Sequence, residues 1–401
     1  MRRMRIITVL TALAVIGVYL MISIFGTSNK REMHQIKVGF VYDGDESAPY
    51  TNNFIRVQKM IDSYDYGGMV TTVAKSNIKA ENGEKAILEL VNEGCDLIFT
   101  TSYGYGEAAK KMAEEHPDIE FCEATCDNAN DDPVLPNYHT FMGEIYQGRY
   151  VSGIVAGMKL KEMIDQGVIT EDQAIVGYVG AYPYAEVISG YTAFILGIRS
   201  IVPTAVMKVR YTNTWTGYTL EKECAKQLIE EGCVIISQHS DTTGPAVACE
   251  YASENGKVVY NVGYNQSMID VAPTTSLIST RIDWSQYMFE AVNAVLYGEK
   301  IEDHVKGNVH GNDVGAGFEE GWVQVLDIND LITPKGTEEA VTETIEKLKN
   351  KQIKVFKGDY IGVNPYDEND VIDLNNGYDE NANASAPSFN YILKDVITIE
   401  E

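Results

Sequence analysis

The chain has 401 residues, enough for two domains with a substantial core, and its 45% hydrophobic content is that of a globular protein. Its formal net charge is −26, and no cluster of Lys and Arg stands out from the body of the chain. We therefore exclude nucleic acid as a partner, because neutralising phosphates requires such a cluster. The acidic excess bears on solubility more than on the identity of a substrate.

Residues 1–29 are predicted to be a membrane anchor or a signal segment. Arginines precede the uncharged run from Ile6 to Phe25, and a helix of that length reaches about 30 Å, the thickness of the bilayer core. A signal peptide has a shorter apolar core and an A-x-A-like cleavage site. The sequence therefore favours an uncleaved anchor over a cleaved signal, and in both cases the body of the chain is exported.

Two similar stretches organise the rest of the chain: 93–109 (EGCDLIFTTSYGYGEAA) and 231–247 (EGCVIISQHSDTTGPAV). In each, an acidic, helix-like run ends at Glu-Gly-Cys. A short apolar strand follows and leads through a Gly-containing polar loop into an Ala-rich helix. Such strand–loop–helix units build parallel sheets, and ligands bind at the carboxyl ends of their strands. The two copies predict two similar lobes that face one cleft.

The first lobe is expected to alternate strands and helices, which is typical of a parallel sheet covered by helices. The predicted strands are 36–42, 68–74, 97–100 and 119–124, and the predicted helices are 54–64, 83–92 and 107–116. The polar stretch 127–139, which contains proline, is expected to cross to the second lobe.

The second lobe repeats this order after a long predicted helix, 146–164, in which Gly148, Gly153 and Gly157 are spaced for close packing. Its predicted strands are 175–179, 205–211, 234–237 and 257–262, with helices at 186–200 and 219–230. The strand 277–281 and the helix 284–297 are expected to return to the first lobe.

These expectations divide the chain into lobes and an extension. Lobe 1 is assigned residues 36–138 and 266–303, and lobe 2 residues 139–265 and 304–358. A strand is predicted at 353–356 (IKVF). Residues 359–401 form an acidic extension with polar stretches typical of surface loops, although the apolar run 389–399 is expected to dock on the body.

The six cysteines do not predict a metal site. Cys95 and Cys233 occupy the same place in the two copies, just before a buried strand, where a small apolar residue packs well. Cys122 and Cys126 form no CxxC pair and have no His at ligand spacing. We expect neither a metal nor a cofactor, and the sequence leaves any disulfide connectivity open.

One stretch of the sequence imitates an enzyme motif. Gly104 to Ala109 fits GxGxxA, which imitates a dinucleotide fingerprint. The motif follows the third strand of its lobe, however, whereas a dinucleotide site uses the first strand–helix turn. With no GxSxG, HExxH or P-loop string in the chain, we expect no enzyme.

Several segments together resemble the basic membrane protein (BMP) family of substrate-binding proteins. The matching segments are DLIFTTSYGYGEAAKKMAEEHPDIEF, FMGEIYQGRYVSGIVAGMKL, IVGYVGAYPYAEVISGYTAFILGIRSIVP, VRYTNTWTGYTLEKECAKQLIEEGCVII and KVFKGD. The resemblance implies a two-lobed α/β protein of the type I periplasmic-binding-protein fold. Such proteins deliver a small molecule, a purine nucleoside in characterised members, to the permease of an ATP-driven importer.

The chain departs from the family at three places. Family members are commonly lipoproteins, and no cysteine precedes Cys95, so a membrane anchor would replace the lipid. The family's first-loop motif, an Asp-Lys-Ser-Phe-Asn-like run, is DESAPYTNN here. The Gly-(Val)-Asp of a later loop is Gly263-Tyr264-Asn265.

The resemblance and the positions of loops point to a set of candidate ligand contacts. A planar base needs aromatic faces on both lobes and polar groups that fix its edge and sugar. The candidates are Tyr50, Asn53, Tyr103, Trp215, Asp241, Asn265 and Trp284. For Asp241 the alternative is a helix N-cap, for Trp284 a place in the core, and His239 is expected to be structural.

Two other functions remain open at this point. The same fold can sense a ligand and signal to a membrane receptor, and the ligand can be a sugar in place of a nucleoside. An exported enzyme acting on nucleosides or glycans would differ from both by turning its ligand over.

Overall fold

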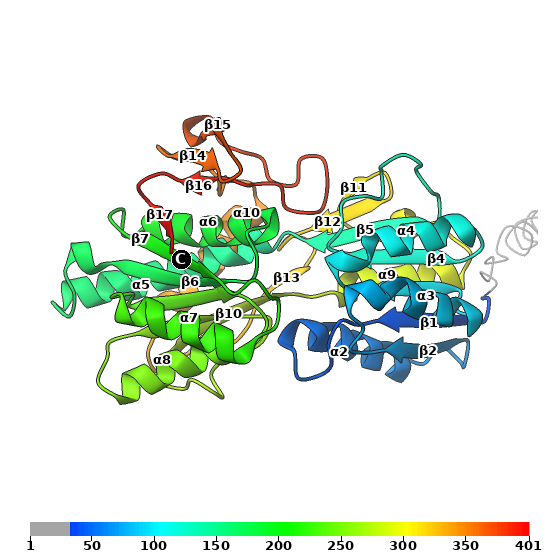
Figure 1. The fold of residues 1–401 in the computed structure, drawn as a ribbon, viewed down its shortest axis with the longest axis horizontal. Helices are drawn as coiled ribbons and strands as arrows, with labels where there is room; N and C mark the ends of the chain where they lie inside the picture. Colours follow the sequence, from blue (N-terminus) through cyan, green and yellow to red (C-terminus); the bar gives the residue numbers. More distant parts are fainter. Residues whose placement is uncertain (1–32, 401) are drawn as a thin grey trace, which may run out of the picture.

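The computed structural model describes residues 33–400, which form two lobes joined side by side (Figure 1). The anchor expected at residues 1–29 lies outside this range. Within the described part, no helix combines the length and the apolar character needed to cross a membrane.

Each lobe is built on a mostly parallel sheet, and the expected two-lobed α/β fold is confirmed. In spatial order the first sheet contains β11 (Asn308–His310), β12 (Asp313–Ala316), β5 (Tyr138–Gly143), β4 (Glu120–Ala124), β3 (Leu97–Thr100), β1 (Ile36–Val41) and β2 (Val70–Lys75). The second contains β13 (Val323–Val325), β10 (Ser276–Ile282), β9 (Tyr260–Tyr264), β8 (Ile235–His239), β6 (Ile175–Gly180), β7 (Val206–Tyr211) and β17 (Ile397–Ile399).

The two copied stretches hold the same place in the two sheets. The run β4-β3-β1-β2 in the first sheet has the same order as β9-β8-β6-β7 in the second. The strands of the copies are therefore β3 and β8, each central in its sheet. Cys95 and Cys233, which precede them, are both 2% exposed, in keeping with a packing role.

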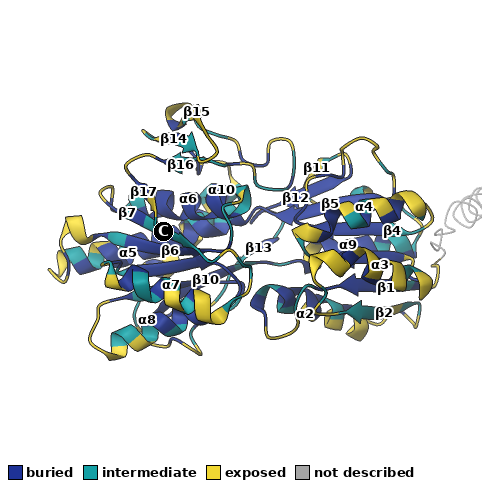
Figure 2. Cartoon of the chain, viewed as in Figure 1, coloured by how far each residue is buried: buried dark blue, intermediate teal, exposed yellow. Residues whose placement is uncertain are grey.

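Helices cover the faces of both sheets, and exposed residues lie on their outer sides (Figure 2). The helices are α2 (Pro49–Ser63), α3 (Gly83–Asn92), α4 (Gly106–Glu115), α5 (Ile145–Asp165), α6 (Ala185–Arg199), α7 (Tyr218–Glu230), α8 (Gly244–Glu254), α9 (Ser285–Leu296) and α10 (Thr337–Lys349). The strands β3 and β8 are buried along their whole length, as parallel strands are when helices cover both faces of the sheet.

Three segments lie in a different sheet from the one expected. β5 pairs with β4 in the first sheet, so the stretch 127–139 stays in lobe 1. β10 pairs with β9 in the second sheet, and β12 pairs with β5 in the first. Short buried strands carry no period that identifies their partners, so pairing is decided by tertiary packing, which sequence patterns do not report.

The strand expected at 353–356 is also wrong, because the structure has no strand there. Val355 and Phe356 are instead buried in irregular backbone. The Phe356 ring stacks on Phe389 of the extension with 4.5 Å between ring centroids. The apolar residues that predicted a strand are thus buried by side-chain contacts with no strand pairing.

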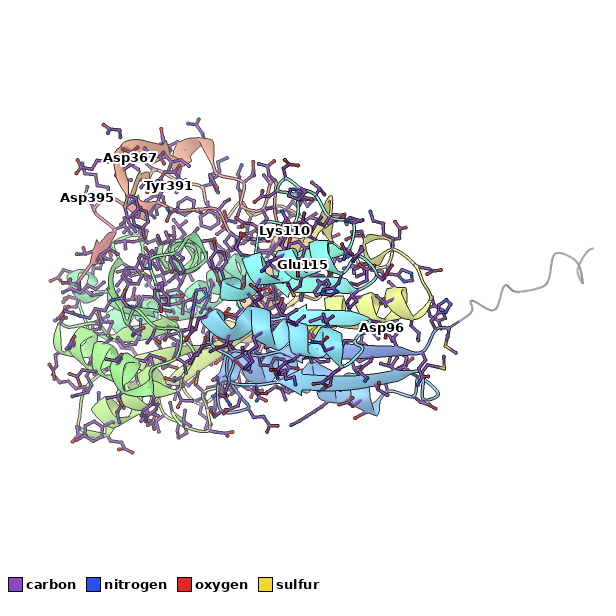
Figure 3. The ribbon with its side chains drawn as sticks, turned by 45° about the vertical axis from the view of Figure 1, so that its right-hand side comes forward. Asp96, Lys110, Glu115, Asp367, Tyr391 and Asp395 are labelled. Carbon is purple, nitrogen blue, oxygen red and sulfur yellow. The ribbon has the colours of Figure 1, made fainter. Side chains whose placement is uncertain are left out.

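The acidic extension folds onto both lobes. Its strands are β14 (Ile361–Asn364), β15 (Asp367–Asp373), β16 (Ile392–Leu393) and β17. The first three make a small sheet above α6, and Figure 3 places Asp367, Tyr391 and Asp395 on this part. β17 adds to the edge of the second sheet beside β7, which confirms that the end of the chain docks on the body.

The extension reaches lobe 1 through one buried polar contact. Ser385, 1% exposed, donates from its backbone N–H and its hydroxyl to the carboxylate of Asp313 in β12, the hydroxyl at 2.6 Å. Thr140 of β5 donates to the same carboxylate at 2.8 Å. A segment anchored on lobe 2 by β17 is therefore also fixed to lobe 1.

Close packing of α5 against α6 depends on glycine, as the spacing predicted. A Cβ on Gly153 would lie 2.2 Å from the carbonyl oxygen of Phe194, and one on Gly197 would lie 2.3 Å from that of Tyr150. Both neighbours are backbone atoms, which cannot rotate away. The two helices therefore approach each other more closely than any larger residue allows.

We expect Gly153→Ala to lower the free energy of unfolding by at least about 2 kcal/mol, because the added methyl must push two helices apart. Urea denaturation measures this change. Lys161→Ala, at an exposed position of the same helix, is the control and is expected to change stability by less than about 0.5 kcal/mol. Equal effects of the two substitutions would contradict the close packing.

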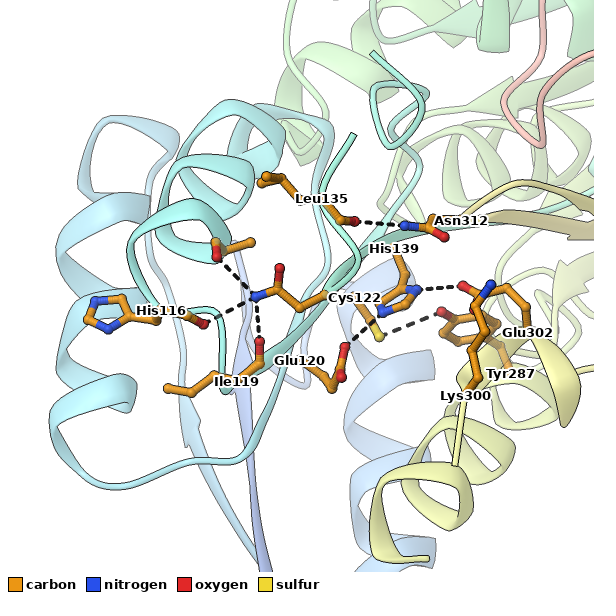
Figure 4. A network of polar contacts seen from close by, with 12 residues as sticks. His116, Ile119, Glu120, Cys122, Leu135, His139, Tyr287, Lys300, Glu302 and Asn312 are labelled. Carbon is orange, nitrogen blue, oxygen red and sulfur yellow. Dashed lines mark hydrogen bonds and ion pairs between the residues drawn. The ribbon is translucent and has the colours of Figure 1, made fainter. Parts of the chain in front are cut away.

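A buried histidine of lobe 1, His139, forms an ion network with two glutamates (Figure 4). The His139 ring, 2% exposed, contacts Glu302 through Nδ1 at 2.5 Å and Glu120 through Nε2 at 2.9 Å. Burial alone would disfavour the imidazolium. The two carboxylates outweigh it and raise the pKa of His139 from 6.5 to about 9, while the same contact lowers the pKa of Glu302.

This network makes stability depend on pH in a defined direction. Because the pKa of His139 is higher in the folded protein, its contribution is complete below about pH 6.5 and is lost as pH rises through about 9. The contribution is on the order of 3 kcal/mol. We expect unfolding in urea to show this loss between pH 6 and 9.5 in the wild type and not in His139→Gln. Parallel pH curves for the two proteins would contradict it.

Candidate functional site: a cleft between the lobes

A cleft lies where the carboxyl ends of the two sheets face each other. This is the position at which parallel α/β sheets bind ligands. Its lining residues are Asp43, Tyr50, Ser102, Tyr103, Thr125, Glu186, Trp215, His239, Asp241 and Tyr264.

Lobe 1 supplies residues that follow three neighbouring strands. Asp43 comes after β1, Ser102 and Tyr103 after β3, and Thr125 directly after β4 with a left-handed φ of 78°. Tyr50 stands in the first turn of α2 and donates its hydroxyl proton to the carbonyl of Thr101 at 2.8 Å. That bond fixes the phenol against the β3 loop.

Lobe 2 supplies the facing wall in the same way. His239 ends β8, Asp241 follows it, and Tyr264 ends β9. Trp215 lies in the loop after β7, and Glu186 lies in the first turn of α6, after β6. Aromatic faces and carboxylate oxygens thus meet in one cleft.

The carboxyl groups of the cleft are electrostatically coupled, and Asp241 among them is buried, at 8% exposure. Burial raises the pKa of Asp43, although a hydrogen bond from Thr51 opposes the shift. Burial also raises the pKa of Asp241 well above its usual range, and the charges of Asp43, Glu221 and Glu186 add to it. Asp43 and Asp241 belong to different lobes, so the two walls repel each other when both groups are ionised.

The histidine of the cleft is held neutral. Burial lowers the pKa of His239, and the nearby guanidinium of Arg149 lowers it further, while the contact of Nε2 with Glu186 at 3.2 Å opposes both. Its Nδ1 is packed against α6, where a Cβ on Gly190 would lie 2.8 Å from it. His239 was expected to be structural; it pairs with Glu186 and lines the cleft as well.

Four of the candidate contacts line the cleft: Tyr50, Tyr103, Trp215 and Asp241. Trp284, in contrast, is 1% exposed and stacks on Phe54 with 4.5 Å between ring centroids. Asp241 is not a helix cap, because the N-cap of α8 is Thr243.

The remaining two candidates lie beneath the cleft and join the lobes. Asn53, in α2 of lobe 1, donates from its amide to the backbone carbonyl of Asn265 at 3.1 Å. Asn265, which follows β9 with a left-handed φ of 66°, donates from its own amide to Asp241 at 3.1 Å. A chain of amides therefore connects lobe 1 to a carboxylate in the cleft wall of lobe 2.

An aromatic row extends from the cleft to its mouth. Trp215 lies 5.4 Å from Tyr182 and 6.2 Å from Tyr184 between ring centroids. Tyr184 in turn lies 6.3 Å from Tyr103 of lobe 1. Tyr103 and Tyr184 are 56% and 46% exposed, so the row crosses from one lobe to the other in contact with solvent.

Sequence reasoning missed Asp43, Ser102, Thr125, Glu186 and Tyr264 as lining residues. Four of them could have been found from position alone, because Asp43, Ser102, Thr125 and Tyr264 fall within two residues of the end of a predicted strand. Nothing in the local sequence marked Glu186, which enters the cleft only because α6 begins at its edge. Within residues 33–400, no group of three or more His, Cys, Asp or Glu side chains could hold a metal ion.

We expect Asp241→Asn to stabilise the ligand-free protein at pH 8. A carboxyl whose pKa is raised by folding holds its proton more tightly in the folded state, so it costs stability as pH rises. The amide keeps an acceptor for Asn265 without the charge, and a rise in melting temperature on the order of 2–4 °C is expected.

Thermal unfolding at pH 5 and pH 8 measures this effect, and the advantage of Asp241→Asn should grow with pH. Asp270→Asn, at an exposed carboxyl of the same lobe, is the control and should leave the melting temperature unchanged. If the variant is less stable than the wild type at pH 8, the charge of Asp241 does not destabilise the folded protein.

Comparison with known proteins assigns this architecture to a family. The model of the Bmp family, described as ABC transporter substrate-binding protein PnrA-like, matches residues 53–358. A purine-binding protein of Brucella abortus is 29% identical over 328 residues, covering 81% of this chain and 84% of its own. A putative ABC transporter glucose-binding protein of Haloferax volcanii is 31% identical over 301 residues, covering 75% of this chain and 68% of its own.

Solved structures agree on the fold. An ABC transporter solute-binding protein of Aeropyrum pernix K1 superposes with a TM-score of 0.62 at 16% identity, over 80% of this chain and 92% of its own. The resemblance to the basic membrane protein family and the type I periplasmic-binding-protein fold are thus both confirmed. The chain belongs to the Bmp family of ABC transporter substrate-binding proteins.

Proposed function

We propose that this protein captures a nucleoside-like molecule, of the purine nucleoside type, outside the cytoplasm and delivers it to the permease of an ABC importer. Capture proceeds by closure of the two lobes, the standard motion of such proteins. The N-terminal segment holds the protein to the outer face of the membrane, or releases it if the segment is cleaved.

The observation that carries the proposal is the combination of aromatic faces and carboxylates in one cleft. Tyr50 and Tyr103 of lobe 1 and Trp215 of lobe 2 line the same cleft, so both lobes offer an aromatic ring to a planar ligand. Asp43 and Asp241 offer acceptors for the hydroxyls and N–H groups of a nucleoside, in charge-assisted hydrogen bonds. The purine-binding name of the Brucella relative supports the same ligand class.

The cleft lining contains no Lys or Arg, which bears on the ligand's charge. A phosphate would meet buried carboxylates without a compensating cation, and this is costly. The proposal is therefore confined to uncharged nucleosides and bases.

A sugar is the second candidate, and two observations favour it. The Haloferax relative is named as a putative glucose-binding protein. Carboxylates beside aromatic faces also suit a pyranose, whose hydroxyls donate in its plane while its C–H face packs on a ring. Signalling to a receptor in place of transport has no comparable support.

A thermal-shift screen over nucleosides, bases and sugars tests the proposal. A ligand at 100 times its dissociation constant is expected to stabilise the protein by about 2.7 kcal/mol, which raises the melting temperature measurably. We expect inosine, guanosine or adenosine to produce the shift. If only glucose or another sugar does, the nucleoside assignment is wrong and the sugar candidate replaces it.

Two variants show whether the shift comes from the cleft. Trp215→Ala removes an aromatic wall and should abolish most of the ligand-induced shift. Tyr251→Ala, an aromatic residue of α8 that is 58% exposed and outside the cleft lining, should leave it intact. Incubating the wild type with the active nucleoside and finding it unchanged, bound one to one, distinguishes binding from turnover.

A further inference from the structure

A buried guanidinium lies directly behind the cleft wall of lobe 2. Arg149, in α5, is 1% exposed. Its Nη1 donates to the backbone carbonyl of Gln238 at 2.9 Å, while Nε and Nη2 have no hydrogen-bond partner within the described residues. A cation with so few partners is costly to bury, so its position calls for an explanation beyond packing.

The guanidinium contacts the two strands that build the wall. Its carbon lies 3.6 Å from the centroid of the Tyr264 ring, at the end of β9, and Gln238 precedes His239 at the end of β8. Tyr264 and His239 both line the cleft, and their rings lie 4.9 Å apart between centroids. Arg149 therefore touches the cleft residues from behind and does not itself line the cleft.

The contact with Tyr264 is a cation–π contact. A guanidinium flat against a ring is attracted by the π-electrons, and the attraction grows when water is excluded. Tyr264 lines the cleft, so a guanidinium that holds its ring acts on a residue of the cleft wall. The same cation favours the neutral form of His239, which leaves Glu186 as the acceptor of that pair.

We propose that Arg149 is a positioning residue for ligand binding: its guanidinium fixes the Tyr264 ring and the end of β8, and so sets the shape and charge of the lobe 2 wall. This inference rests on the proposed function, because it concerns the same cleft. It also identifies a source of selectivity, since Tyr264 is a residue of the cleft wall.

The chain offers a matched control for this arginine. Arg199, in α6, also lies over a tyrosine, 5.3 Å from the ring centroid of Tyr360, and also donates to a backbone carbonyl, that of Ala205 at 2.6 Å. Neither Arg199 nor Tyr360 lines the cleft. Loss of Arg199 therefore reports the structural cost of such a pair without the cleft.

The experiment compares Arg149→Met, Arg149→Lys and Arg199→Met by calorimetric titration with inosine and with hypoxanthine, well below each melting temperature. We expect Arg149→Met to bind inosine about tenfold or more weakly and to change the ratio of the two dissociation constants. Arg149→Lys should recover only part of the affinity, because an ammonium does not stack flat on a ring. Arg199→Met should lose stability and keep both constants.

Wild-type constants in folded Arg149→Met would overturn the proposal, as would equal effects of Arg149→Met and Arg199→Met. If the wild type binds a sugar and no nucleoside, the proposed ligand fails while Arg149 is still tested with that sugar. A measurement without ligand tests the role of Arg149 independently of the proposed ligand. The ring resonances of Tyr264 in ¹³C-tyrosine-labelled protein, assigned with Tyr264→Phe, should shift in Arg149→Met and not in Arg199→Met; unshifted resonances in both would refute the role.

Discussion

The burial of carboxyl groups at the junction of the two sheets is the constraint on which the cleft depends. Asp43 belongs to lobe 1, and Asp241 and Glu186 belong to lobe 2, so ionised groups oppose each other across the gap. Without a ligand, approach of the lobes removes Asp43 and Asp241 from water and raises the pKa values of both carboxyl groups. Hydrogen-bond donors placed between them reverse the effect, because each carboxylate then gains the partners that burial took away.

The same constraint explains why cations and amides surround the cleft without lining it. Arg149 lies behind Tyr264, and the chain Asn53–Asn265–Asp241 runs beneath the floor. These groups hold the wall in place and leave the acceptor oxygens facing the ligand. An arginine in the lining itself would pair with the carboxylates and close the site to uncharged molecules.

Most helices and strands could be predicted from the sequence because their periodicity is strong and their ends are marked. The helix 83–92 and the strand 97–100 agree with the prediction at both ends. The partners of β10 and β12 could not be predicted. A short apolar strand has the same sequence pattern in either sheet, and only packing in three dimensions decides which strand it pairs with.

The lining of the cleft was predictable to the extent that strand order determines it. Tyr103 and Asp241 were predicted because they follow the strands of the two copied stretches, and both line the cleft. Trp284 illustrates the limit: its position before a helix near the hinge fits a cleft residue equally well, but stacking on Phe54 places it in the core. The role of Arg149 was invisible for the same reason, because its partner Tyr264 lies more than a hundred residues away.

The extension beyond the family match imposes a condition on any movement of the lobes. It is tied to lobe 2 by pairing of β17 with β7 and by a salt bridge from Lys208 to Glu400 at 3.1 Å. It is tied to lobe 1 by Ser385 and Asp313, both 1% exposed. Opening the cleft must therefore either carry this segment along or expose a carboxylate whose pKa burial has already raised. Breaking that contact is expensive because its donors are not replaced inside the protein, so hinge motion should occur within the range that the Ser385 contact allows.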